Sequence, residues 1–524
     1  MKKNAILIKG ITLTAGLILS IVTFYMALIP QAFGEITGSS GKKTGRAVMV
    51  VIDHVSLDDI SGKNLPVIRR IIAAGAVGLM TTNPGAGGYR TPENTYITIG
   101  AGAKVLGGES GGQGFNAGEQ YENGKAAKSY YGRTGLEAKG EVVNLGIAQI
   151  ETANQNLKYS SVPGLVGTVL HSYGLKTGVI GNADVYGLQE KDKFRRYAVN
   201  IAMDRNGQVD YGEVGSLCLT TDDGFLGGTR SDYKFLLKKF RQIKDDTGFV
   251  VIETGDTSRL ENQSNLASLE ALQKQKKKTL ARIDVFLGEL LEEVDLNKDL
   301  LMIVVPGPSN ESMEKGDFLT PIIMAGKGVE PGIVYSGTTR RDGLISNTDI
   351  AATVIKFLGV PPVVKGPGEK RDFIFNGQVI EGKPSANPID EVSVVSEKTK
   401  FMHNARYPFV KTYLNLCLII LAVSVAAIKL EIKAGDLIKP VLLAVTFIPA
   451  IFLLADFMSG FSQAVAGLLM GIVTLVLVLF SDYVSKTFRF SPFMISCGMT
   501  IALLVFDVFT GANLSKTSPL SYDA

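Results

Sequence analysis

Cysteine and histidine are both scarce in this chain, which has three of each among its 524 residues. Three cysteines exclude a disulfide-stapled scaffold and every zinc module built mainly from cysteine. Three histidines restrict any zinc enzyme that takes its ligands chiefly from imidazole. An excess of one charge is also lacking, because 54 basic and 50 acidic residues leave a net charge of +4. That balance offers no electrostatic basis for nucleic-acid binding.

Apolar sequence, in contrast, is abundant at both ends. Charged residues make up only 20% of the chain and the mean hydropathy is +0.20, which indicates membrane segments. Residues Gly10–Phe33 carry no charge and are long enough to cross a bilayer of about 30 Å. This segment is either an uncleaved anchor or a cleaved signal peptide, and both options export the central region of the chain. Four more spans are predicted: Thr412–Ile428, Val441–Ala455, Ala464–Phe480 and Phe490–Phe509.

The distribution of lysine and arginine between the loops predicts how these segments are oriented in the membrane. The residues before Gly10 and the loops 429–440 and 481–489 are basic, whereas the loop Asp456–Gln463 has no basic residue. Basic loops stay in the cytoplasm, so we expect a multi-pass protein of the cell membrane with a cytoplasmic N-terminus. The predicted order is an anchor over residues 1–34, an extracytoplasmic domain over 35–410, four transmembrane helices within 411–511 and a tail over 512–524. Asp507 is either a polar group near a helix end or part of a proton or substrate relay.

The external region has the pattern of an α/β domain. Its first strand is predicted over Ala47–Asp53, followed by a helix over Leu65–Ala74. Further strands are predicted over Lys176–Ile180, Gly248–Glu253, Leu300–Pro306 and Pro321–Ala325, and the stretch Asn265–Val294 is rich in helix. Strands that alternate with helices favour a parallel sheet covered on both faces. Ligands gather at the carboxyl ends of such strands, where the sequence places Asp53, Asp184, Asp256 and Asn310.

A glycine-rich stretch, Asn83–Gly118, is interpreted either as an irregular surface loop or as backbone that approaches a ligand or another chain closely. It contains neither a Walker-type phosphate loop nor a dinucleotide-binding pattern.

The order of these pieces resembles the alkaline phosphatase superfamily over most of Ala47–Pro362. The resemblance rests on MVVIDHVSLDDI, RTPENTYITIGAG, VVIETGDTSRL and GLISNTDIAATVIKFLGVPP, which occur in the family's order. It implies an α/β/α sandwich with a mostly parallel sheet, to which the N-terminal and C-terminal transmembrane helices are added. It also implies a Ser or Thr nucleophile that two zinc or manganese ions activate.

Only some of the family's functional residues have a counterpart in this sequence. Asp53 matches the metal ligand of the first strand, and Thr91 matches the nucleophile, with Thr95 as the alternative. Asp256 matches the acid of an Asp-x-x-Gly-His pair, but the position of the histidine holds Leu260. The Asp-His pair expected at the next strand is replaced by Pro306-Gly307-Pro308. We therefore expect the two-ion site to be lost, although Asp53, Asp256 and the weaker candidates Asp184 and Glu253 could hold one Mg²⁺ or Mn²⁺.

The three histidines do not restore the site. His54 follows Asp53 directly, so on a continuing strand its side chain would point to the opposite face, whereas a turn at this point would change that direction. His171 ends a predicted helix, Leu165–His171, and His403 lies beside the second predicted span. A structural role is expected for each.

Three functions remain open. The leading one is a phosphatase-like domain, catalytically silent or altered, that binds an envelope polymer or a membrane protein while its helices lie in the lipid bilayer. The second is an active phosphatase or phosphotransferase that uses Mg, Mn or Zn on envelope substrates, and the third is a transport-associated protein. No organic cofactor and no nucleic acid are expected for any of them.

Overall fold

A computed structural model describes residues 45–521, apart from residues 63, 86–87, 109, 156, 158–160, 186–193, 362, 366–371 and 432–434. The predicted first apolar segment, Gly10–Phe33, lies outside the described residues. The strands and helices predicted for the external region are present within two to four residues of the expected bounds.

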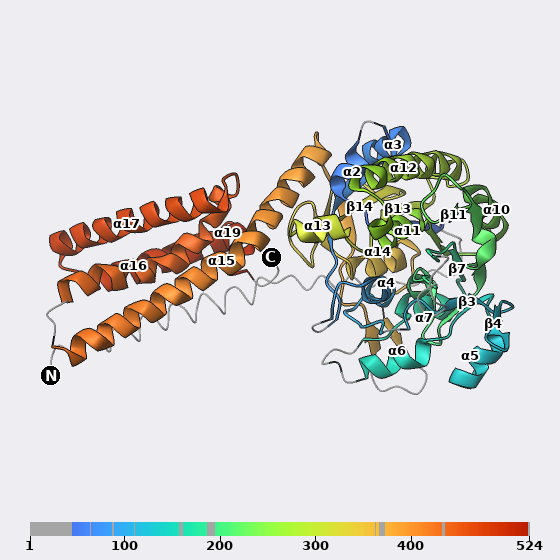
Figure 1. Ribbon diagram of the computed structural model, residues 1–524, viewed down its shortest axis with the longest axis horizontal. Helices are drawn as coiled ribbons and strands as arrows, with labels where there is room; N and C mark the ends of the chain where they lie inside the picture. The colour runs from blue at the N-terminus through green and yellow to red at the C-terminus, as the bar shows by residue number, and fades with distance from the viewer. Residues whose placement is uncertain are drawn as a thin grey trace. The chain divides into compact units, whose positions relative to one another are not determined.

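The α/β region is built on one ten-stranded sheet in the order β19-β15-β2-β14-β13-β1-β12-β7-β9, with β16 paired to β2 (Figure 1). Its strands are β1 (Ala47–Val51), β2 (Ala76–Thr81), β7 (Thr177–Ile180), β9 (Tyr211–Glu213), β12 (Phe249–Glu253), β13 (Leu300–Val304), β14 (Leu319–Gly326), β15 (Gly332–Ser336), β16 (Leu344–Ser346) and β19 (Ile380–Pro384).

Most neighbouring strands of this sheet run parallel, as predicted. β1 pairs in parallel with both β12 and β13, and β7 continues the parallel order to β9. β14 departs from the expectation, because it runs antiparallel to β13 and to β2. Only the short helix α13 (Asn310–Glu314) lies between β13 and β14, and a parallel return would need a longer crossover. β2 and β1 nevertheless point the same way, so their carboxyl ends share one edge.

Alternation along β1 sends its side chains into two separate hydrophobic cores. Met49 and Val51 belong to the core on one face, and Val48 and Val50 belong to the core on the other. Helices cover both faces, which explains why β1 is an unbroken apolar run rather than an alternating one. The first core is completed by helices such as α4 and α7 and the second by α3, α10 and α12 (Figure 1).

The helices of this region are α2 (Leu57–Ser61), α3 (Pro66–Ala74), α4 (Pro92–Ala101), α5 (Ala126–Thr134), α6 (Ile147–Asn154), α7 (Leu165–Ser172), α9 (Val199–Ala202), α10 (Tyr233–Ile243), α11 (Asp256–Asn262), α12 (Leu269–Leu291) and α14 (Asp349–Phe357), with 3₁₀ turns η1 (Ser216–Cys218) and η2 (Ser264–Leu266). Four small sheets comprise β3 (Gly114–Asn116), β6 (Val142–Asn144) and β8 (Gln208–Val209); β4 (Gln120–Tyr121) and β5 (Gly124–Lys125); β10 (Leu219–Thr221) and β11 (Thr229–Ser231); and β17 (Val363–Lys365) and β18 (Asp372–Ile374).

Glycines of the stretch Asn83–Gly118 serve close packing inside the domain. Gly100 lies in α4, where a Cβ atom would stand 2.2 Å from the carbonyl oxygen of Asn200. Any larger residue would therefore push α4 away from α9. Much of the stretch is buried, including the end of α4 at residues 95–101, so it is not a loop confined to the surface.

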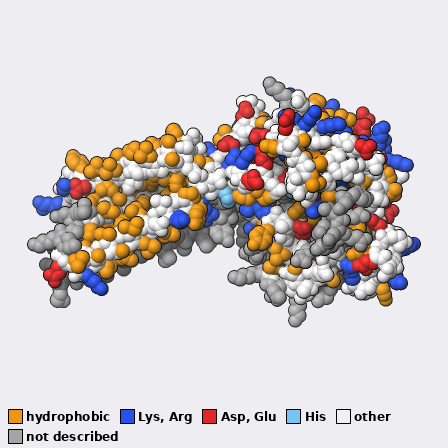
Figure 2. All heavy atoms as spheres, viewed as in Figure 1, with side chains coloured by type: hydrophobic (Ala, Val, Ile, Leu, Met, Phe, Trp, Pro, Cys, Tyr) orange, Lys and Arg blue, Asp and Glu red, His pale blue; other side chains and the backbone are white. Residues whose placement is uncertain are grey.

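The C-terminal region consists of apolar helices: α15 (Pro388–Lys429), α16 (Gly435–Leu453), the 3₁₀ turn η3 (Ala455–Met458), α17 (Gln463–Phe488), α18 (Pro492–Phe509) and the short α19 (Asn513–Lys516). Helices α15, α17 and α18 are each long and apolar enough to cross a membrane. Hydrophobic side chains cover much of their surface, whereas charged side chains gather on the α/β domain (Figure 2). Apolar surface of this extent is stable in lipid and not in water.

The predicted span Val441–Ala455 lies in a helix with two internal prolines. This helix, α16, contains Pro440 and Pro449, and Ile438–Leu453 is its apolar part among the described residues. α16 packs against α15, α17 and α18, and its residues Phe447 and Ile451 are buried between them. The predicted domain boundary at residue 410 falls inside α15, which runs without interruption from the α/β domain into its apolar half.

Candidate functional site

Asp53 and Glu253 end neighbouring parallel strands and meet at one tyrosine. The hydroxyl of Tyr96, from α4, lies 3.0 Å from Asp53 Oδ2 and 3.2 Å from Glu253 Oε1. The other oxygen of Asp53 accepts the backbone N–H of Gly307 at 2.7 Å and that of His54 at 3.0 Å. Gly307 belongs to the Pro-Gly-Pro stretch that stands where the resemblance would place an Asp-His pair. Hydrogen bonds from within the protein therefore reach both oxygens of Asp53, the candidate metal ligand.

One hydroxyl proton cannot serve two carboxylates at the same time. Burial, and then the charge of Asp53, raise the pKa of Glu253 to about 8. A protonated Glu253 can donate through Oε1 to the Tyr96 oxygen while Tyr96 donates to Asp53, which links the three groups with one net charge and leaves Glu253 Oε2 buried without a hydrogen-bond partner among the described residues. Burial and the two carboxylates also raise the pKa of Tyr96 well above its usual value, so Tyr96 stays a donor.

His54 does not lie on the opposite face from Asp53. The strand ends at Val51, and His54 adopts a left-handed backbone conformation with φ of 57°. Its Nε2 atom therefore lies 3.5 Å from Asp53 Oδ2, and its Nδ1 atom lies 3.0 Å from the carbonyl oxygen of Pro308. The chain therefore turns here, which is the alternative that the sequence left open, because β1 ends before Asp53.

Asp256 is paired with an arginine. It begins α11 after β12, is 0% exposed, and its Oδ1 atom lies 2.8 Å from Nη1 of Arg259. The same oxygen accepts the backbone N–H of Ser231 at 2.8 Å, and Oδ2 accepts the hydroxyl of Tyr233 at 2.7 Å. A cation and two neutral donors thus surround the carboxylate that the resemblance assigns to a metal.

Arg259 uses all five of its N–H donors. Besides Asp256, it donates to the hydroxyl of Ser231, to the carbonyl oxygen of Asp184, and twice to Asn182, at distances of 2.7–3.0 Å. Gly255 permits this approach, because its φ is +69° and a Cβ atom there would stand 2.0 Å from the carbonyl oxygen of Asn182. A buried guanidinium with every donor satisfied is a structural element of the domain.

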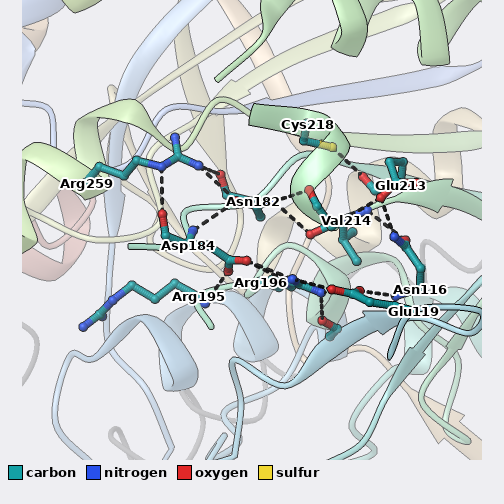
Figure 3. Close-up of polar contacts among 12 residues, drawn as sticks. Asn116, Glu119, Asn182, Asp184, Arg195, Arg196, Glu213, Val214, Cys218 and Arg259 are labelled. Atoms are coloured by element: carbon teal, nitrogen blue, oxygen red, sulfur yellow. Dashed lines mark hydrogen bonds and ion pairs between the residues drawn. The ribbon is translucent and has the colours of Figure 1, made fainter. Parts of the chain in front are cut away.

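Asp184 is bound in a second arginine pair (Figure 3). Arg196 contacts Asp184 Oδ2 at 2.9 Å and bridges to both carboxylate oxygens of Glu119 at 2.7 and 2.9 Å. Its guanidinium also lies 4.8 Å from the ring centres of Phe115 and Phe194. Arg259 reaches the backbone of Asp184 from the other side, so the two buried arginines join Asp184 and Asp256 into one network.

The candidate nucleophiles lie elsewhere on α4. Thr91 is the half-buried N-cap residue of this helix, and its side chain makes no capping hydrogen bond. No hydrogen bond among the described residues joins Thr91 to Asp53 or Asp256. Thr95 is fully buried, and its hydroxyl donates to the carbonyl oxygen of Pro92 at 3.4 Å. Of the two residues, only Thr91 is partly exposed.

These contacts test whether the residues fit the two-ion site that the resemblance implies. A metal ligand needs a free lone pair directed at the ion, and coordination excludes a guanidinium from the same position. Asp53, Asp184 and Asp256 each spend both oxygens on protein donors, and two of the three face arginine. In the described part of the chain, no three His, Cys, Asp or Glu side chains are grouped so that they could hold a metal ion. The residues do not fit that site.

Sequence reasoning missed Tyr96, Arg196, Tyr233 and Arg259. Arg259 left a visible signal, because it occupies the glycine position of the Asp-x-x-Gly-His pattern directly before Leu260. A large cation next to a buried acid is itself a reason to expect an ion pair in place of a metal. The other three carry no such signal, because they reach the site from helices and loops distant in sequence.

Comparisons with known proteins give structural matches only. No protein-family model matches the sequence, and no curated protein matches it. The PH0037 protein from Pyrococcus horikoshii is 15% identical over 61% of this chain and 98% of its own, with a TM-score of 0.37. The lipoteichoic acid synthase LtaP from Listeria monocytogenes is 11% identical over 64% and 76%, with a TM-score of 0.37. A protein in the alkaline phosphatase superfamily from Vibrio parahaemolyticus is 12% identical over 62% and 68%, with a TM-score of 0.35.

Members of the alkaline phosphatase superfamily are thus among the solved structures that match this chain. Likenesses this distant say nothing of individual residues or of chemistry, which depend on the contacts within the chain.

Proposed function

We propose that this protein is a multi-pass membrane protein that displays a catalytically silent, alkaline phosphatase-like domain at the cell envelope, where the domain has a binding role. In this proposal residues 35–410 form the extracytoplasmic domain, and residues 411–511 contribute four transmembrane helices. The lipid bilayer is its first partner, and an envelope polymer or a membrane protein is the second.

One observation carries the silent assignment: the ion pair of Arg259 with Asp256, 1% and 0% exposed. Activation of a threonine by two metal ions contributes several kcal/mol to lowering the barrier. Arg259 occupies the place of a metal ion beside Asp256, and Gly307 and Tyr96 donate hydrogen bonds to Asp53. The lowering of the barrier by metal ions is therefore missing. Thr91 then has no base and no metal within the described contacts to deprotonate it.

The test uses the full chain purified in detergent with Mn²⁺, Mg²⁺ or Zn²⁺ in turn. An aryl phosphate, an aryl phosphodiester and an aryl sulfate serve as substrates, and Thr91→Ala serves as the matched control. We expect equal background rates for the wild type and Thr91→Ala, and substoichiometric metal after dialysis. Hydrolysis by the wild type that Thr91→Ala abolishes, or stoichiometric bound zinc or manganese, would establish the enzyme instead.

A further inference from the structure

A cavity of about 620 Å³ lies at the same sheet edge as the candidate site, between the α/β domain and the segment that follows α18. The described residues that line it comprise three cations, Lys104, Arg341 and Lys516, and no carboxylate. The rest of the lining is mainly hydroxyl and amide side chains, among them Thr81, Asn83, Ser346 and Asn376. Positive charge with hydroxyl and amide donors is the chemistry that recognises phosphate.

The third cation is brought to the cavity by the end of the last apolar helix. Asp507 lies in the final turn of α18 and is 1% exposed. Its carboxylate accepts the backbone N–H groups of Leu514 at 2.6 Å and Ser515 at 2.9 Å, which fixes the start of α19. Lys516 then donates to the carbonyl oxygen of Arg340 at 2.9 Å and so ties the segment to the domain. These contacts give Asp507 a structural role at a helix end.

The cations of the cavity repel one another. Burial, and then the charges of Arg341 and Arg340, lower the pKa of Lys516. Asp342, which pairs with Lys383 at 2.5 Å, and Asp507, which accepts backbone N–H groups, offset part of this effect at Lys516. Behind the wall, Asp349 accepts Thr338 and the backbone N–H of Ser346 and is not among the lining residues. An anion in the cavity would relieve this repulsion.

The cavity also lies close to a membrane surface. Lys516 follows the apolar helix α18 by only seven residues, and Ser515, Leu520 and Ser521 complete that wall. A ligand that reaches the cavity along the bilayer surface needs only its headgroup inside.

We propose that this cavity binds the phosphate group of an anionic ligand at the membrane surface, with the headgroup of an anionic phospholipid as its source. Lys104, Arg341 and Lys516 contact the phosphate oxygens, and the hydroxyl and amide side chains orient the rest of the headgroup. The site is separate from Asp53, Asp256 and Thr91, and it gives the binding role of the proposed function a definite ligand. It rests on that proposal only for the location of the domain at an envelope surface.

Isothermal titration calorimetry of the full chain in a non-ionic detergent tests the proposal. The probes are dihexanoyl phosphatidylglycerol, dihexanoyl phosphatidylcholine and inorganic phosphate. We expect phosphatidylglycerol to bind at least about tenfold more tightly than phosphatidylcholine. The choline cation neutralises the phosphate of phosphatidylcholine, whereas phosphatidylglycerol keeps a net negative charge. Lys104→Ala and Lys516→Ala should each weaken its binding about tenfold, and Lys516→Arg should restore most of it.

The matched control is Lys298→Ala, which removes one exposed lysine at the opposite edge of the sheet and should leave binding unchanged. Lys104→Ala leaves the tether from Lys516 to Arg340 intact, so it tests the site even where Lys516→Ala lowers the melting temperature.

Tight binding of inorganic phosphate with no gain from the lipid supports the phosphate site and overturns the lipid source. Equal binding of both lipids, or unchanged binding in both alanine variants, overturns the site. Hydrolytic activity is a separate readout, so failure here is distinguishable from failure of the silent assignment.

Discussion

Arg259→Met is the perturbation that most directly probes the buried arginine pair. It keeps much of the aliphatic volume, removes the guanidinium, and leaves the carboxylate of Asp256 buried without its cation. Breaking a buried pair by removing one partner costs about 3–5 kcal/mol. The carbonyl oxygens of Asn182 and Asp184 lose their donors as well, so we expect the upper half of that range. At about 2–4 °C per kcal/mol, the melting temperature of the domain falls by roughly 8–20 °C.

The reactivity of the Cys218 thiol can be used to measure unfolding of the domain. It is buried in the domain, and burial raises the pKa of its thiol, so it reacts with a thiol-specific dye only after unfolding. In a Cys417→Ser and Cys497→Ser background, the dye signal during heating reports unfolding of this domain alone. The control is Arg241→Met, which breaks an exposed pair with Glu293 and should cost about 0–1 kcal/mol.

The double variant Asp256→Asn with Arg259→Met separates a charge effect from a packing effect. Because it removes the unpaired buried charge, it should be more stable than Arg259→Met alone. Three results would refute the reasoning: a shift for Arg259→Met no larger than that of Arg241→Met, a double variant no more stable than the single one, or a higher melting temperature of the wild type in Mn²⁺ or Zn²⁺.

Two further predictions concern pH. Because the folded domain holds the Glu253 proton more tightly than the unfolded chain does, stability falls as pH rises from about 4.5 to 8, on the order of 5 kcal/mol in all. Glu253→Gln should match the wild type near pH 5 and exceed it in melting temperature at pH 9; parallel curves would contradict this. Burial opposes a charged His171, but Asp204 and Asp210 outweigh it and raise its pKa to about 9. His171→Gln should therefore cost about 1–2 kcal/mol below pH 6.5 and nothing at pH 10, and a constant loss would exclude the ion pairs.

The positions of the strands and helices could be read from the sequence because they depend on local patterns. The apolar run of β1 requires burial on both faces, and the covalent spacing from Leu65 to Gly75 accommodates one amphipathic helix. The same holds for α15, α17 and α18, whose length and apolarity are properties of the residues themselves. The antiparallel direction of β14 relative to β13 could not be predicted from local patterns. It depends on where the chain lies after the short helix α13, which separates the two strands.

The candidate site was readable only as a set of positions. The sequence places Asp53, Glu253, Asp184 and Asp256 at strand ends, and parallel strands bring such ends to one edge. Arg259 lies only three positions after Asp256, but Tyr96 and Gly307 reach Asp53 from more than 40 positions away. Local spacing carries no information about such pairs.

The sequence by itself determined that an α/β domain stands beside apolar C-terminal helices, and that histidine is missing from the positions where the resemblance requires it. Only the tertiary structure decided what fills those positions. Gly307 and Tyr96 satisfy Asp53, Arg259 satisfies Asp256, and Arg196 satisfies Asp184. The tertiary structure also decided that Lys104, Arg341 and Lys516 line one cavity. The physical reason is the same in both cases: a buried charge takes its counterpart from whichever segment folding places beside it, whether that is three residues away, as Arg259 is from Asp256, or much further along the chain.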